Sequence, residues 1–246
     1  MTNISNPLSD KERLRITRLY DHDYVNLLQS MIDVFEVVGY NLKHKAFEEL
    51  SSREKLIHKS VDWVFHTNYV GSAIYSLAQD EFPLESVDAK RYRTLINVIG
   101  SSLERGRLSY DERKNIDSFQ SVPAVLYCML FNLVKNGARA QYRAKREEPI
   151  LVSVHRYQGI PTACFRPQGS EEYSDFLEFR VQDVGGGFPE QNSFRSYFEK
   201  DAPSAKGHGF GLYFVGLAAK VLRAPIEIIS TPGNTSVSVY HPIFPA

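Results

Sequence analysis

The sequence predicts an α+β protein in which a helical region, residues 1–108, precedes an α/β domain, residues 109–246. Three observations support this prediction. Apolar residues recur at helical spacing through the first hundred residues. The second half combines helical segments with runs that read as strands. A glycine-rich stretch near residue 207 leads directly into an apolar helix, which is typical of a ligand-binding loop.

The composition fits a globular protein, with 43% hydrophobic and 24% charged residues. Because 29 basic residues balance 29 acidic ones, we expect no nucleic-acid partner held by bulk charge. Cys128 and Cys164 have no cysteine near them in the sequence, which argues against a disulfide framework or a zinc site and favours a reducing compartment. No apolar run approaches the ~20 residues that span a bilayer, and no signal peptide is visible. We therefore expect a soluble, cytoplasmic protein.

The first region is expected to contain three amphipathic helices. The helical period runs through residues 21–42, and a third helix is expected over residues 86–105. The second helix begins near Ser52, and its apolar residues fall at four-residue intervals: Ile57, Val61, Phe65, Tyr69, Ala73 and Leu77. The second and third helices would form an antiparallel hairpin. Such a hairpin must bury its apolar stripe against the rest of the chain or against a second copy, which leaves a homodimer open.

One face of the second helix carries His58, Asp62 and His66, each a turn apart. A carboxylate beside an imidazole fixes its tautomer and raises its basicity, which suits a phosphate acceptor. The alternative is that these histidines lie on the surface and have no role.

The α/β domain opens with a helix near Val122. Its predicted core residues are Val125, Leu126, Met129, Leu130, Leu133 and Val134. Asn132 and Asn136 interrupt this apolar pattern at a spacing of four, so both amides lie on one side, and Arg139 follows one turn later. Amide oxygens suit magnesium and an arginine suits phosphate, although a solvent-facing pair of asparagines is the alternative.

Four strands are predicted after this helix. The first two, residues 150–154 and 176–182, are separated by a long hairpin loop over residues 155–173. The second strand ends at Asp183, which can accept a hydrogen bond from an exocyclic amine, while Gly185 and Gly187 would let the backbone approach a ligand. An ordinary Asp-Gly turn is the alternative. The last two strands, residues 226–229 and 236–240, flank a clear hairpin turn.

A glycine stretch precedes the last helix, with Gly207, Gly209 and Gly211 at alternate positions. The residues after it keep the helical period at Leu212, Val215, Ala219 and Leu222. A mobile glycine loop at a helix N-terminus offers free N–H groups and the positive end of the helix dipole to an anion. The alternative is a flexible loop that only caps the helix.

Taken in order, these segments resemble the sequence boxes of sensor histidine kinases. Their N box is matched by residues 132–139, and their two glycine boxes by residues 183–189 and 207–212. Weaker matches are residues 194–198, which resemble the F box, and residues 233–235, which resemble the threonine turn that closes the adenine pocket. The resemblance covers about residues 121–242. The same superfamily contains DNA gyrase, heat-shock chaperones and mismatch-repair ATPases.

The resemblance implies a Bergerat-type α/β sandwich that holds ATP under a lid. By this resemblance Asp183 and Thr235 would bind adenine, Asn136 would coordinate Mg²⁺, and Arg139 would touch phosphate. Other residues implied at the nucleotide are Asn132, Gly185, Gly187, Lys206, Gly207, His208, Gly209, Phe210, Gly211 and Leu212. Hydrolysing relatives carry a glutamate base where this chain has Asn132. Because an amide has no useful basicity, ATP is expected to be poised for transfer to a side chain rather than to water.

The function that the resemblance implies is that of a cytoplasmic histidine kinase of a two-component system. Mg-ATP would phosphorylate a histidine, and the aspartate of a response regulator would receive the phosphate. The usual acceptor motif, a histidine followed by an acidic residue and Leu-Arg-Thr-Pro, is absent, so His66 is the first candidate because of its regular helix and Asp62. Ala140 also stands where an aromatic residue is usual, with Tyr142 as the nearest substitute.

Two other functions remain open from the sequence. One is a non-catalytic dimeric adaptor or phosphotransfer protein that keeps the fold. The other is a protein-serine kinase of the anti-sigma type, which binds and inhibits a partner.

Overall fold

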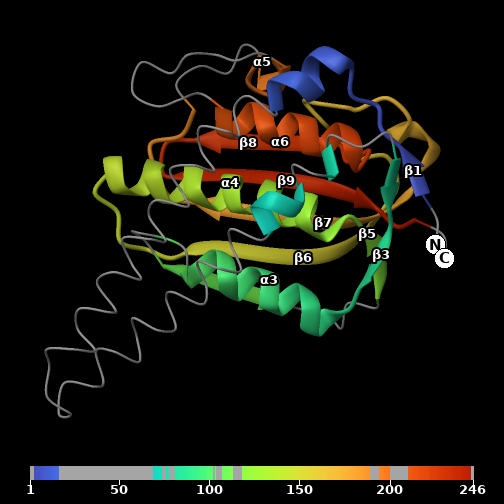
Figure 1. Ribbon diagram of the computed structural model, residues 1–246. Coiled ribbons are helices and arrows are strands. Elements are labelled where there is room, and N and C mark those ends of the chain that lie inside the picture. The colour runs from blue at the N-terminus through green and yellow to red at the C-terminus, as the bar shows by residue number, and fades with distance from the viewer. Residues whose placement is uncertain are drawn as a thin grey trace, which may run out of the picture.

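A computed structural model describes residues 3–16, 69–73, 76–77, 81–101, 103, 107–112, 118–188, 194–199 and 210–244. In these residues a five-stranded mixed sheet is covered on one face by helices (Figure 1). The predicted helix over residues 21–42, most of the second helix and the hairpin they were expected to build lie outside the described residues. None of the described helices is long and apolar enough to cross a bilayer.

The sheet has the strand order β4-β6-β7-β9-β8. Its strands are β4 (Leu108–Glu112), β6 (Ile150–Gln158), β7 (Asp175–Asp183), β8 (Ile226–Thr231) and β9 (Asn234–Pro242). All neighbours are antiparallel except β4, which runs parallel to β6. Alternate residues of β7, Leu177, Phe179 and Val181, are buried and share one face of the pleat. That face of the sheet forms one side of the hydrophobic core.

The first two predicted strands are confirmed, but β6 is longer than predicted. It continues to Gln158 because Tyr157 pairs with Phe176 and Gln158 pairs with Asp175. The loop between the strands therefore spans residues 159–174, and within it Phe165 forms a bridge to Ile226 at the edge of β8. The predicted hairpin between β8 and β9 is also confirmed.

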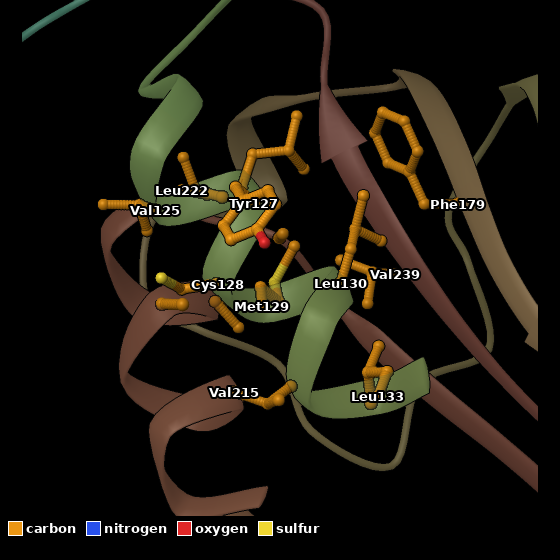
Figure 2. Close-up of a cluster of buried hydrophobic side chains, with 14 of the residues drawn as sticks. Val125, Tyr127, Cys128, Met129, Leu130, Leu133, Phe179, Val215, Leu222 and Val239 are labelled. Atoms are coloured by element: carbon orange, nitrogen blue, oxygen red, sulfur yellow. The ribbon is translucent and has the colours of Figure 1, made fainter. Parts of the chain in front are cut away.

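Three helices cover the buried face of the sheet. They are α3 (Ala89–Ser101), α4 (Pro123–Arg143) and α6 (Phe210–Val221), with α4 between the other two (Figure 1). Side chains of α4 and α6 meet those of β7 and β9, including Leu130, Val215, Phe179 and Val239 (Figure 2). All six core residues predicted for α4 are buried, and its first residue is a proline, which suits the first turn of a helix.

Helix α3 is shorter than the predicted helix over residues 86–105. Its start moves to Ala89 because Ser86 and Val87 belong to β3 (Glu85–Val87), which pairs with β5 (Phe119–Ser121). The Tyr92 ring of α3 lies 5.4 Å from the Phe179 ring of β7, so this helix packs on the sheet of its own chain. The division of the chain into domains at residue 108 stays a prediction.

The N-terminal segment packs on the same unit. Strand β1 (Asn3–Ser5) pairs with β2 (Glu81–Pro83), and a helical segment over residues 10–16 lies over α6 (Figure 1). Ser9 and Glu12 form a capping box at the start of this segment, since Ser9 N–H donates to Glu12 Oε2 at 2.9 Å and Glu12 N–H donates to Ser9 Oγ at 3.3 Å. Lys220 of α6 then donates to Glu12 Oε1 at 2.6 Å.

Candidate functional site

The paired amides of α4 meet the start of α6. A Cβ placed on Gly211 would lie 3.3 Å from Asn132 Oδ1 and 3.4 Å from Asn136 Nδ2. Both asparagines are half-buried, so they are neither core residues nor fully solvated ones. The structure therefore brings together two segments that the sequence separates by more than seventy residues, and the glycine at position 211 allows the close approach.

The orientation of Asn132 limits its chemistry. Its Nδ2 donates a hydrogen bond of 2.8 Å to the carbonyl oxygen of Cys128, one turn earlier in α4. The amide oxygen is left on the side of Gly211. An amide held in this way can accept a hydrogen bond but cannot take a proton from water, so it supplies no general base.

Asp183 is the last residue of β7 and lies against Gly137 of α4. The residue is 7% exposed, and its Oδ1 accepts a 2.8 Å hydrogen bond from Gly185 N–H. A Cβ on Gly137 of α4 would lie 3.2 Å from Asp183 Cβ, so only glycine lets the helix approach this strand end without strain. Burial raises the pKa of Asp183, and the bond from Gly185 offsets only part of that rise. A ligand that donates to this carboxylate would compensate for its lost hydration.

The first glycine loop lies directly on α4. A Cβ on Gly185 would lie 2.7 Å from Ala140 Cβ and 2.8 Å from Asp183 Oδ1. This contact gives Ala140 a role, because a small residue on the helix lets the loop close over the end of β7. Tyr142, the nearest aromatic residue in the sequence, is 58% exposed.

The β8–β9 hairpin completes this end of the site. Thr235 pairs with Asp183 across β7 and β9, and with Ser230 across β8 and β9. Ser230 Oγ lies 3.2 Å from Thr235 Oγ1 and accepts a 2.9 Å hydrogen bond from Phe188 N–H. Gly233 N–H in the hairpin turn donates to Gly185 O at 2.8 Å. The glycine loop and the hairpin are therefore joined to each other around Asp183 and Thr235.

Sequence reasoning missed Ser230. Its position follows from register: the two-residue turn pairs Thr231 with Asn234, so the next pair inward is Ser230 and Thr235. The predicted hairpin turn thus contained the signal that could have identified this serine.

The other predicted site residues are placed only in part. Arg139 is exposed on α4 one turn beyond Asn136, and Leu212 is half-buried against the core. The side chain of Phe210 lies outside the described residues, as do Lys206, Gly207, His208, Gly209 and the candidate acceptor His66.

The donor set suits a hard cation that is shared with a ligand. No group of three or more His, Cys, Asp or Glu side chains in the described part of the chain could hold a metal ion. Magnesium commonly uses few protein ligands and completes its shell with water and phosphate oxygens. The half-buried amide oxygen of Asn136 fits that chemistry.

These features define a Bergerat-type α/β sandwich: paired amides on a central helix, approached by Gly211, and a buried aspartate at a strand end, approached by Gly185. Residues 121–244 match the family described as histidine kinase-, DNA gyrase B-, and HSP90-like ATPase. The match covers half of the chain and includes α4, the first glycine loop, α6 and the β8–β9 hairpin. The chain belongs to this ATPase family, which confirms the family resemblance and the fold that the sequence predicted.

Two solved structures are similar to the chain. Full-length ShkA in complex with AMPPNP is 14% identical, with a TM-score of 0.52 over 95% of this chain and 46% of that chain. The chain thus spans about half the length of ShkA, and the two share a fold. The Acinetobacter baumannii histidine kinase AdeS is 10% identical, with a TM-score of 0.46 over 91% of this chain and 98% of that chain. No curated protein matches the chain in sequence.

Proposed function

We propose that the protein is an ATP-dependent histidine kinase that phosphorylates a histidine of its own helical region. The observation that carries this proposal is the hydrogen bonding and the position of the Asn132 amide. Its amide is bound to the Cys128 carbonyl and faces Gly211, in the place where hydrolysing relatives carry a basic glutamate. Without a base to activate water, the γ-phosphoryl group would pass to a side chain instead.

In this proposal some of the described residues bind the adenine at one end of the pocket and others bind the phosphates at the other end. Asp183 accepts a hydrogen bond from the adenine amino group, and the Thr235 hydroxyl lies beside it. Asn136 would hold Mg²⁺, which would neutralise charge on the phosphates. Arg139 and the backbone of the second glycine stretch contact the phosphate oxygens.

The acceptor in this proposal is His66, with Asp62 one turn before it in the sequence. An imidazole nitrogen attacks the γ-phosphorus, the bond to the bridging oxygen breaks, and ADP leaves. The aspartate of a response regulator then takes the phosphoryl group. We place this phosphorelay in the cytoplasm, with the chain acting as a homodimer through its helical region.

Incubation of the full chain with labelled ATP and Mg²⁺, followed by phosphosite mapping, tests the proposal. We expect an acid-labile label that His66→Ala and Asn136→Ala abolish. Asn97→Ala, an exposed asparagine of helix α3, is the matched control and should leave labelling unchanged. Label on another histidine would refute the assignment of His66 alone.

Two outcomes favour the alternatives. Tight ATP binding without label on any residue would support an adaptor that keeps the fold. Acid-stable label on an added partner would support a serine kinase of the anti-sigma type.

A further inference from the structure

A row of three polar side chains crosses the end of the sheet. Asp183 on β7, Thr235 on β9 and Ser230 on β8 are successive cross-strand partners. All three are at least nine-tenths buried, with exposed fractions of 7%, 4% and 8%. By the two-residue period of a strand they share the face of Val181 and Val237, which lies under the helices.

Ser230 connects this row to the first glycine loop. Its Oγ accepts a 2.9 Å hydrogen bond from Phe188 N–H and lies 3.2 Å from Thr235 Oγ1. Gly187, just before Phe188, has a φ of +78°, and a Cβ there would lie 3.2 Å from Ser230 Oγ. The loop therefore closes tightly over the serine, and the serine contacts the threonine that neighbours Asp183.

We propose that Ser230 is a positioning residue that sets the base selectivity of the pocket by fixing the hydroxyl of Thr235. The inference rests on the proposed binding of ATP at this site. Phe188 N–H donates to one lone pair of Ser230 Oγ, which lies 3.2 Å from Thr235 Oγ1, and either of these two hydroxyls can donate to the other. In this inference the serine is the donor and Thr235 Oγ1 is the acceptor. Hydroxyls in such a chain polarise one another, so the Thr235 proton points into the pocket beside the Asp183 carboxylate.

An acceptor beside a donor matches one edge of adenine. Adenine offers its amino group as a donor and its adjacent ring nitrogen as an acceptor. Guanine offers a carbonyl oxygen and a ring N–H at the same two positions, which is the reverse pattern. With guanine, the Asp183 carboxylate would face the carbonyl oxygen, and the Thr235 hydroxyl proton would face the ring N–H. Neither pair can form a hydrogen bond, and leaving buried polar groups unpaired discriminates strongly between ligands.

A purely structural role for Ser230 predicts a different result. If the serine only held the hairpin to the glycine loop, its loss would weaken ATP and GTP binding equally. The ratio of the two dissociation constants therefore separates positioning of Thr235 from general support of the fold.

The test measures the Kd of the full chain for ATP and for GTP by calorimetry at one Mg²⁺ concentration. We expect the unmodified chain to prefer ATP, and Ser230→Ala to reduce that preference by about tenfold, the effect of one misdirected hydrogen bond. Ser230→Thr keeps the hydroxyl and should restore the preference. Ser238→Ala is the matched control, because Ser238 is a buried serine on the opposite face of β9 that donates to Glu178, and it should leave the ratio unchanged.

An unchanged ratio in folded Ser230→Ala, or an equal loss of affinity for both nucleotides, would overturn the inference and leave the proposed function standing. Binding of neither nucleotide by the unmodified chain would overturn the proposed function as well. If the alanine variant did not fold, Ser230→Cys would replace it, since a thiol keeps most of the volume but bonds only weakly. A cysteine variant with the unmodified ratio would then overturn the inference.

Discussion

The buried carboxylate of Asp183 lowers the stability of the fold and, in the proposed function, binds the nucleotide base. Burial raises its pKa, and the hydrogen bond from Gly185 N–H offsets part of this rise. A carboxyl group whose pKa is higher in the folded state than in the unfolded state makes the fold lose stability as the pH rises above the unfolded pKa, and the full cost of the buried charge is present above the folded pKa.

We therefore expect Asp183→Asn to separate stability from binding. The amide keeps the shape and one acceptor oxygen but removes the buried charge, so the free energy of unfolding at neutral pH should be unchanged or raised. The Kd for ATP should rise at least about tenfold, because a charge-assisted hydrogen bond is roughly twice as strong as a neutral one. Urea unfolding and calorimetry measure the two quantities. Unchanged ATP affinity would contradict the role of Asp183 in base binding.

His241 is buried without any exposure and should make stability depend on pH. Its Nε2 lies 2.9 Å from Ser121 Oγ, and its Nδ1 donates to Pro242 O at 2.6 Å. Burial lowers its pKa from 6.5 to about 4. The unfolded chain therefore binds a proton between these values while the folded chain does not.

The sign follows from this difference in proton binding. Above pH 6.5 the imidazole is neutral in both states and has no effect, whereas from there down to about pH 4 the free energy of unfolding should fall by about 1.4 kcal/mol per pH unit. The phenyl rings of Phe119, Phe179 and Phe244 surround the imidazole and offer it no charge. Urea unfolding at several pH values should show a flatter profile for His241→Asn, and parallel profiles would contradict this account.

Single residues were predictable where their chemistry was local. Asn132 and Asn136 stand out because amides interrupt an apolar helix at a spacing of four, and Asp183 stands out before a glycine run. The partnership of Ala140 with Gly185 and that of Ser230 with Phe188 were not predictable in the same way. Both join segments that are far apart in the sequence, and their residue types are common in helices and strands.

Whole elements were predictable when they were long enough to show a period. From Leu126 to Gln141 the buried residues of α4 follow the helical period, and from Leu177 to Gln182 apolar and polar residues alternate in β7. Strands β3 and β5 have three residues each, too few for any alternation to appear. Part of β3 was therefore assigned to the helix that follows it.

Helix α5 (Phe194–Glu199) packs so closely on α6 that the contact requires a glycine at position 216. A Cβ on Gly216 would lie 2.2 Å from Phe198 O and 2.8 Å from Phe198 Cβ. The nearer atom belongs to the backbone, so it cannot move by changing a rotamer. One or both helices would have to shift.

We expect Gly216→Ala to lower the free energy of unfolding by about 2–3 kcal/mol, the cost of overpacking a core. Gly100→Ala is the matched control in helix α3, where the nearest atom to the added Cβ is Leu108 Cβ at an ordinary 3.7 Å. That variant should gain up to about 1 kcal/mol from helix propensity. Opposite signs in urea unfolding are the expected result, and a neutral Gly216→Ala would show that the helices can separate freely.

At the scale of the whole molecule, the N-terminal segment, residues 3–16, belongs to the same core as helices α4 and α6. Leu8 and Ile16 are 4% and 3% exposed within the cluster that includes the residues of α4 and α6. Tyr69 stacks on Tyr127 of α4, with ring centroids 4.7 Å apart. Two segments from the predicted helical region therefore rest on the two helices that carry the paired amides and Gly211. Nothing in the sequence of residues 3–16 predicts this docking, because the contacts are made to residues far away in the sequence, from β2 to Lys220.

The ion pair between Glu12 and Lys220 joins these distant parts of the chain. Burial raises the pKa of Glu12, but hydrogen bonds from Lys220 and Ser9 outweigh it and hold the pKa below its usual value. The pair is partly exposed, with side chains 21% and 31% accessible, so its contribution is modest. A carboxyl group with a depressed folded pKa stabilises the protein above its unfolded pKa, and this stability is lost as the pH falls through the folded value.

Glu12→Gln should accordingly lower the free energy of unfolding by about 1 kcal/mol at pH 7, and the difference from the unmodified chain should shrink as the pH falls through the lowered folded pKa of Glu12. Glu199→Gln is the control, because its partner Arg195 is 67% exposed and the pair is worth less than about 0.5 kcal/mol. Urea unfolding at pH 7 and at a series of lower pH values measures each difference. Because Lys220 lies in α6, whose first turn faces Asn132, the affinity for ATP should fall together with stability in Glu12→Gln and stay unchanged in Glu199→Gln. If stability fell but affinity did not, the N-terminal segment would support the fold without reaching the nucleotide site.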